Sequence, residues 1–158
     1  MAEIKQGRWL AQIEGDFVVF IIGTRVDLRH PVRWFRDVGG IRGMPHMLSK
    51  LSKDPESGFL GVMNLGLVNI QYWRSFEHLE RWSADAMKPH KPALKKYWKR
   101  VGREPRSGIW HETYLVRAGE YEAVYGNMPP HGLGKAAGLV PAAEDSTARK
   151  RLRRAVAS

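Results

Sequence analysis

One run of β-branched and aromatic residues constrains the fold of this chain more than any other segment: GDFVVFIIGTRV, residues 15–26. Its longest apolar stretch, Phe17 to Ile22, has the length of a strand. It is far shorter than the roughly 18 residues that a helix needs to span a bilayer. Because the run is continuously apolar, it predicts a central strand that is buried on both faces.

The patterns on either side of this strand give the order of a ferredoxin-like sheet. A helix is expected after the His30-Pro31 step, and glycines and Pro45 should bend or break it. Two strands around Gly66 predict a hairpin. Two helices, a strand and two short extended segments complete the expected elements: 75–84, 88–101, 109–116, 8–13 and 121–125. Strand, helix, hairpin, helix pair and strand is the βαββαβ order of an α+β fold with an antiparallel sheet.

We expect one domain over residues 1–143, and a basic, disordered tail over residues 144–158. From Pro129 the sequence is rich in Gly, Pro and Ala, which predicts an irregular C-terminal arm. Helices cover one face of such a four-stranded sheet. A second copy of the chain is the simplest cover for the other face, so we expect a homodimer.

The net charge of +10 suggests nucleic acid, but the distribution of the charge argues against it. The basic residues gather in the tail and on the expected helix at 88–101, where a solvated helix face explains them. No helix-turn-helix, zinc-finger or RNP-like sequence accompanies them. With no cysteine, no secretion signal and no apolar run long enough for a membrane span, we expect a cytoplasmic protein without a membrane partner.

The histidines are the best candidates for chemistry, because the sequence has no Walker loop, GxGxxG, GxSxG or HExxH motif. His111 and His90 adjoin rigid elements and have aromatic neighbours. A neutral imidazole there can ligate haem iron or move a proton. Glu112 cannot share a metal with His111, because adjacent strand residues point to opposite faces. A dedicated metal centre other than haem iron is therefore not expected.

Polar-tipped aromatic rings are too numerous for an ordinary small core and suggest a pocket for a flat apolar ligand. Those rings are Tyr72, Trp73, Trp98, Trp110, Tyr114, Tyr121 and Tyr125.

The segment QYWRSFEHLERW, residues 71–82, resembles the strand-to-helix signature of the antibiotic-biosynthesis-type monooxygenases. With GDFVVFIIGTRV, GIWHETYLV and YEAVYGNMPP, it resembles a monooxygenase-like branch of that dimeric α/β-barrel superfamily. The resemblance covers roughly residues 8–141. It implies a small-molecule substrate and either no cofactor or haem. Trp73 matches the haem-contacting Trp of haem-degrading members, and His90 falls near their histidine. Their first-strand Asn has no match, which argues against haem degradation.

We therefore expect an enzyme, a monooxygenase-like oxidoreductase acting on a small apolar or aromatic substrate between sheet and helices. Tyr72, Trp73, Trp110 and Tyr114 would line the pocket, with His111 or His90 as base or axial ligand. Glu112 or Arg74 would orient these groups or hold an anionic substrate group. Two alternatives stay open: a non-catalytic dimer that binds haem or another small molecule, and a nucleic-acid-associated basic protein.

Overall fold

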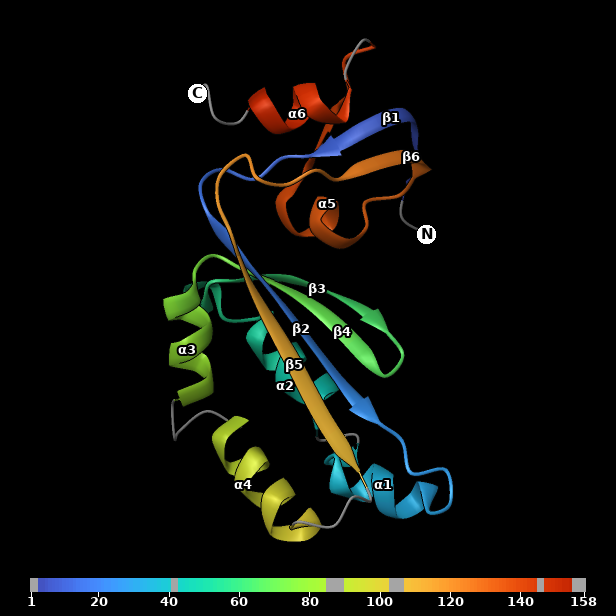
Figure 1. The fold of residues 1–158 in the computed structure, drawn as a ribbon, viewed down its shortest axis with the longest axis vertical. Coiled ribbons are helices and arrows are strands. Elements are labelled where there is room, and N and C mark those ends of the chain that lie inside the picture. The colour runs from blue at the N-terminus through green and yellow to red at the C-terminus, as the bar shows by residue number, and fades with distance from the viewer. Residues whose placement is uncertain (1–2, 41–42, 85–89, 103–106, 145–146, 155–158) are drawn as a thin grey trace.

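The computed structural model describes residues 3–40, 43–84, 90–102, 107–144 and 147–154. Its elements follow the expected order, with additions towards the C-terminus (Figure 1). In chain order they are β1 (Lys5–Ala11), β2 (Phe17–Arg25), α1 (Pro31–Asp37), α2 (Met44–Leu51), a 3₁₀ turn η2 (Pro55–Ser57), β3 (Phe59–Leu65), β4 (Val68–Trp73), α3 (Phe76–Ala84), α4 (His90–Val101), β5 (Gly108–Val116), β6 (Val124–Met128), α5 (Gly132–Ala137), β7 (Leu139–Pro141) and α6 (Ala148–Arg154).

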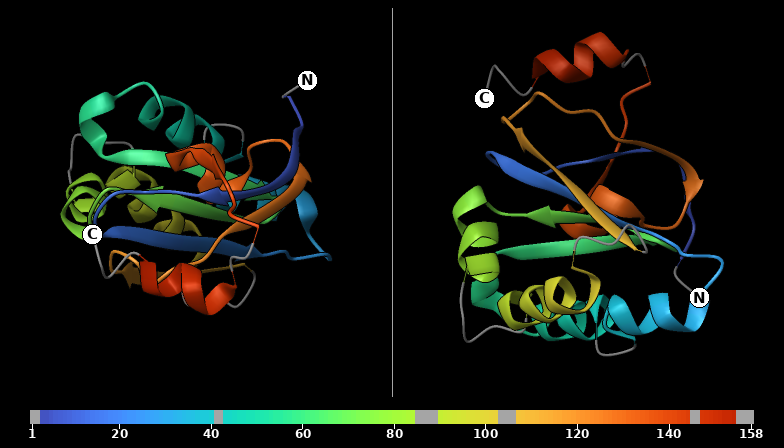
Figure 2. Two further views of the ribbon diagram at one scale, coloured as in Figure 1. Left: turned by 90° about the horizontal axis from the view of Figure 1, so that it is seen from above. Right: turned by 60° about the horizontal axis from the view of Figure 1, so that its bottom comes forward.

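The main sheet is antiparallel, with strand order β3-β4-β2-β5. The strand over residues 17–25 lies inside the sheet, between β4 and β5, which confirms its central place. This is the ferredoxin-like α+β arrangement that the sequence predicted. Helices α1 to α4 lie on one side of the sheet (Figure 2, right). We call that side of the sheet the helix face, and the opposite side the open face.

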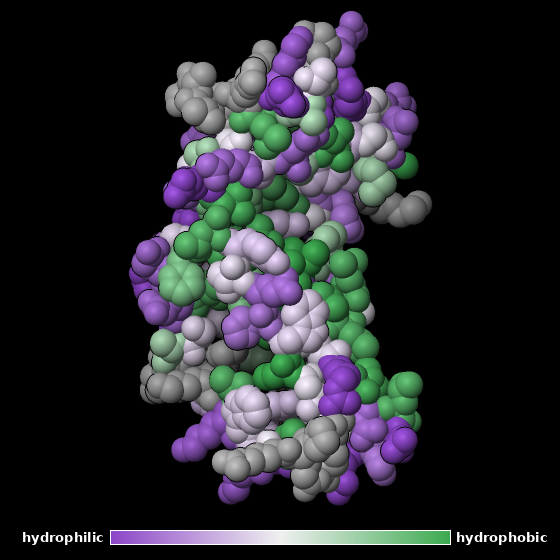
Figure 3. All heavy atoms as spheres, in the orientation of Figure 1, coloured by the Kyte–Doolittle hydropathy of each residue, from purple (hydrophilic) through white to green (hydrophobic). Residues whose placement is uncertain are grey.

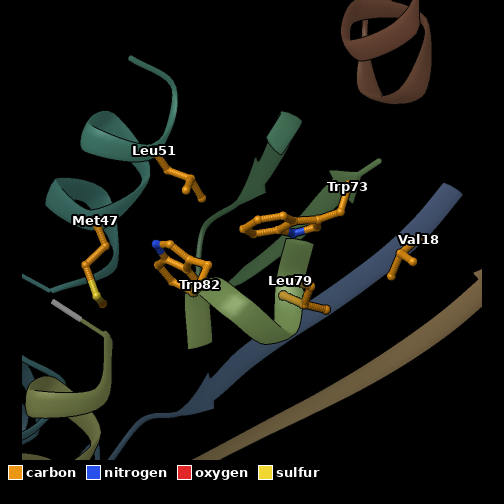
Figure 4. Close-up of a cluster of buried hydrophobic side chains, with 6 residues drawn as sticks. All are labelled: Val18, Met47, Leu51, Trp73, Leu79 and Trp82. Atoms are coloured by element: carbon orange, nitrogen blue, oxygen red, sulfur yellow. The ribbon is translucent and has the colours of Figure 1, made fainter. Parts of the chain in front are cut away.

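The core under the helices is built around two tryptophans (Figure 4). Trp73 at the end of β4 packs against Trp82 of α3, with ring centroids 5.7 Å apart. Val18, Met47, Leu51 and Leu79 complete the cluster. Phe59 meets Trp73 edge-on at 5.2 Å. These contacts fix α2 and α3 against the sheet.

The segment from Pro129 is more regular than expected. Strand β7 pairs with β1, and β1 also pairs with β6, so a second sheet of order β6-β1-β7 forms at one end of the molecule. Helix α5 packs on the open face near β3, where Leu133 and Tyr72 share a second core cluster. The prediction of an irregular C-terminal arm is therefore wrong. Its hydrogen bonds go to a strand some 130 residues earlier, which no local pattern signals.

The tail also contains structure where disorder was expected, because residues 148–154 form α6. Arg151 of α6 pairs with Glu122 near the start of β6. An ion pair near the surface contributes about 0–1 kcal/mol. A contact of this kind adds little to the stability of the body.

Deleting residues 145–158 is therefore expected to leave the melting temperature nearly unchanged. At this chain length 1 kcal/mol corresponds to about 2–4 °C. Thermal unfolding followed by circular dichroism tests this expectation. A fall of more than about 5 °C would mean that α6 packs more firmly than this contact indicates.

Candidate active site

Alternate residues of three neighbouring strands face the helices, and several of them are polar. Ile22 of β2 lies opposite His111 of β5 on one side and Asn69 of β4 on the other. Phe20 lies in the same way between Thr113 and Gln71. Side chains directly opposite each other project to the same side of a sheet. The helix face therefore carries an apolar strip along β2 with polar groups on both flanks.

Gln71 is the best-anchored of these polar groups, with no exposed surface. Its Oε1 accepts a hydrogen bond from Trp73 Nε1 at 3.1 Å. Its Nε2 donates to Asn69 Oδ1 at 3.4 Å and approaches the Met44 sulfur at 3.8 Å. A buried amide needs such partners, because an unpaired one costs about 1–3 kcal/mol. This network fixes the orientation of Asn69 beside the apolar strip.

His111 is the one histidine that β5 places on the helix face. Its ring lies 5.4 Å from the Phe20 ring at an interplanar angle of 36°. The side chain is exposed, and among the described residues neither ring nitrogen has a hydrogen-bond partner. A nitrogen in that state is available to accept a proton or to bind a ligand.

A hollow lies beside β5 on this side of the molecule, in the direction of α4 (Figure 3). The helix-face residues of β2 next to His111 are Phe20 and Ile22, both partly buried. An apolar strip with a few fixed polar groups beside it is the usual lining of a small-molecule site.

Three of the expected site residues face the other way. Trp110, Glu112 and Tyr114 occupy alternate positions of β5 on the open face, where Gly23 lies opposite Trp110. A Cβ at Gly23 would come within 2.7 Å of the Trp110 ring, so glycine lets this indole lie across β2. The structure therefore does not bring Trp110, Glu112 or Tyr114 together with His111.

Glu112 acts on Tyr114 instead of on His111. Tyr114 Oη donates to Glu112 Oε2 at 2.6 Å. This hydrogen bond and the carboxylate charge raise the pKa of the Tyr114 phenol, since ionisation would break the bond and place two negative charges together. The sequence analysis expected Glu112 to orient His111. Glu112 instead binds Tyr114, two residues along β5 on the same face.

The expected site residues at the end of β4 also lie in different parts of the structure. Tyr72 points to the open face beneath α5, where burial and then the neighbouring Tyr125 raise the pKa of its phenol. Trp73 is fully buried among core side chains, so it has no surface to offer a cofactor. Arg74 Nη1 donates to the Glu14 carbonyl at 3.0 Å, away from the helix face. The structure does not describe the side chain of His90.

Sequence reasoning missed Asn69 and Gln71. Both lie on the VNIQYW strand at alternate positions, in line with Trp73. Their spacing could have revealed them, because residues two or four positions before a buried strand tryptophan lie on the same face of the sheet. No cluster of three or more His, Asp or Glu side chains suited to a metal occurs in the parts of the chain that the structure describes.

The fold has a solved counterpart. By fold, the chain is similar to an aldoxime dehydratase, OxdRE, solved with butyraldoxime. The TM-score is 0.61 at 18% identity, over 84% of this chain and 40% of that one. A weaker likeness, with a TM-score of 0.36 at 14% identity, covers 66% of this chain and 95% of SnoaB, a cofactor-independent oxygenase from Streptomyces nogalater.

The sequence itself identifies the family. Residues 17–133 match the family described as Monooxygenase af470-like, so the chain belongs to that family. A curated relative, Monooxygenase af470 of Aspergillus fumigatus, is 27% identical over 180 aligned residues. The match covers 93% of this chain and 60% of that protein, so the chain spans about three-fifths of the relative's length. The monooxygenase-like resemblance is confirmed.

Proposed function

We propose that the protein is a monooxygenase-type oxidoreductase that binds a small apolar or aromatic substrate on the helix face, beside His111. Membership of a monooxygenase family supports the reaction class. The observation that carries the site is the unpartnered His111 imidazole, which lies against Phe20 on the helix face of the sheet. We infer the site from that geometry.

Without a cofactor, the chemistry would begin with proton transfer to His111. An activated methylene or phenol loses a proton to the imidazole, and the resulting anion is electron-rich enough to reduce dioxygen. For a methylene, the overall balance is CH₂ + O₂ → C=O + H₂O, in which the substrate supplies all four electrons. The protein's part is to accept the proton and to exclude water from the anion.

Haem is the alternative cofactor. Bound haem would supply iron that activates oxygen or a nitrogen–oxygen bond. Among the described residues, His111 fits the role of axial ligand, because its ring nitrogens are unpartnered and its ring stands on a strand. Trp73 does not fit the expected role of haem contact, because it is enclosed in the core.

Two measurements on the purified full-length chain test the proposal. Dioxygen uptake with phenols and activated methylene compounds, with and without haemin, should show substrate-dependent consumption. An absorption titration with haemin then separates the two routes: a sharp Soret band at one equivalent indicates bound haem. A Soret band without oxygen uptake would indicate a non-catalytic haem-binding protein and not an enzyme. If neither response occurs, the proposed function is wrong.

We also propose that the protein is a homodimer formed through the open face. Beyond the part covered by α5, this face presents apolar side chains that include Leu65, Trp110 and Tyr114, each 42–54% exposed. Contiguous exposed apolar patches of this kind mark interaction sites. A stable dimer buries about 1,200 Å² or more in total, and a sheet face is large enough for that.

Leu65→Lys is expected to convert a dimer into a monomer of 18.0 kDa, because the ammonium would be buried against an apolar partner face. Leu115→Lys is the matched control, since Leu115 is also exposed, at 69% against 54% for Leu65, but lies on the helix face of β5. Sedimentation equilibrium at micromolar concentration measures both variants and the parent. A monomeric parent would exclude the dimer, and a dimeric Leu65→Lys variant would exclude this interface.

A further inference from the structure

Helix α1 and the turn before it form a basic surface with projecting aliphatic side chains at one end of the molecule (Figure 1). Leu28 is 86% exposed and Val32 is 83% exposed, the two highest values among the large hydrophobic residues described. Phe35, on the next turn of the helix, is about half exposed. Apolar and hydrophilic side chains meet at this end in Figure 3. We call the set Leu28, Arg29, Val32, Arg33, Phe35 and Arg36 the α1 surface.

The outward direction of these side chains follows from how α1 is anchored. Trp34 points inward, and its Nε1 donates to Thr24 Oγ1 of β2 at 3.3 Å. Asp37, on the next turn, is buried. Val32 and Arg36, two residues before and after Trp34, lie nearly opposite to it around the helix and point to solvent. The rest of the described chain offers Leu28 and Val32 no apolar cover, so their exposure is a property of the surface itself.

The charge of the α1 surface is positive because its carboxylates are withdrawn from solvent. Asp27 Oδ2 lies 3.1 Å from His30 Nδ1, its Oδ1 accepts from the Arg29 amide, and its side chain is only 14% exposed. Arg100 of α4 donates to the Arg36 carbonyl at 2.7 Å, which adds a further cation beside α1. A depression of about 440 Å³ opens here, lined by His30, Pro31, Val32, Arg33 and Arg36.

We propose that the α1 surface docks on a bilayer containing anionic phospholipids. Leu28 and Val32 insert at the boundary between headgroups and acyl chains, while the arginines bind headgroup phosphates and the depression holds one of them. Interfacial segments that lie flat on a membrane combine these two features, and they need no spanning length. No described helix is long and apolar enough to cross a membrane. That finding concerns spanning and leaves surface binding open.

Nucleic acid is the less suitable partner for the same residues. A phosphate backbone would satisfy the arginines but would leave Leu28 and Val32 in water, with no apolar cover gained on binding. A membrane interface satisfies both kinds of side chain at once. The inference is independent of the proposed function, because it uses none of the residues around His111.

Vesicle sedimentation with the full-length chain tests the docking. The parent should sediment with phosphatidylcholine vesicles that contain phosphatidylserine and stay in the supernatant with phosphatidylcholine alone. Arg33→Gln with Arg36→Gln should weaken binding about 30-fold, since each basic residue at an anionic surface contributes roughly fivefold. Leu28→Ser with Val32→Ser should weaken it by about tenfold or more, because two aliphatic side chains no longer leave water.

Two control variants at the other end of the molecule keep the result specific. Ile4→Ser removes an exposed aliphatic side chain, and Arg117→Ser with Lys135→Ser removes two exposed cations. Both should bind like the parent. If the parent does not sediment with anionic vesicles, the proposal is wrong. It is also wrong if the control variants lose as much binding as the α1 variants. Equal binding of the parent and the Leu28/Val32 variant to vesicles, with tight binding of both to duplex DNA, would assign the surface to nucleic acid instead.

Discussion

Replacing Trp73 with alanine is expected to lower the free energy of unfolding by about 3–5 kcal/mol, enough to unfold much of a marginally stable domain. Trp73 has no exposed surface and contacts Trp82, Phe59 and Val18. Its removal leaves a cavity and deprives Gln71 Oε1 of its donor. Urea unfolding of the variant and the parent, followed by tryptophan fluorescence and circular dichroism, measures the change.

Trp98→Ala is the matched control, because this tryptophan of α4 is 56% exposed. Its removal should cost less than about 1 kcal/mol. The comparison also decides between the packing role and the haem contact that the family resemblance implied for Trp73. If Trp73→Ala stays as stable as the parent but loses a haemin-induced Soret band, Trp73 contacts a cofactor and the core assignment fails.

Replacing His111 with alanine is expected to lower turnover about 10²–10⁴-fold, the usual contribution of a general base. Stability should change little, because the side chain is exposed and packs on one face against Phe20. The fall should appear in kcat more than in KM, since the imidazole acts on the proton and the apolar strip holds the substrate. Dioxygen uptake at varied substrate concentration measures kcat and KM, and thermal unfolding measures the stability.

His131→Ala is the control for general effects of removing a histidine. His131 is also exposed but precedes α5 on the open face, and its side chain makes no capping hydrogen bond. It should leave turnover and the haemin spectrum unchanged. An active His111→Ala variant would show that the imidazole is not the base. Loss of the Soret band in His111→Ala alone would make it the axial ligand. An unfolded variant would show a structural role, and His111→Gln would then separate folding from chemistry.

The sequence predicted the main sheet because its signals are local or strongly periodic. The apolar run Phe17 to Ile22 predicted the central strand, although Val19 to Ile22 are only partly buried and not enclosed on both faces as expected. Gly66 supplies the positive φ of the hairpin turn. The resemblance around QYWRSFEHLERW gave the family. The second sheet was not predictable in this way, because β7 is three residues long and its partner β1 lies at the other end of the chain.

The candidate site was predicted only in part, for a reason that lies in strand geometry. Period-two alternation already separates Tyr72 from Trp73, and His111 from its neighbours Trp110 and Glu112. It does not say which side the helices cover. Cross-strand register decides that His111 shares a face with Gln71 and Asn69.

By itself, then, the sequence determined the βαββαβ order, the central strand, the family and the set of residues that could carry chemistry. Only the tertiary structure decided which of those residues meet. It enclosed Trp73 in the core, turned Trp110, Glu112 and Tyr114 to the open face, and left Leu28 and Val32 projecting between arginines. Propensity and periodicity act within a few residues along the chain. Faces, pockets and surfaces depend instead on contacts between segments far apart in sequence.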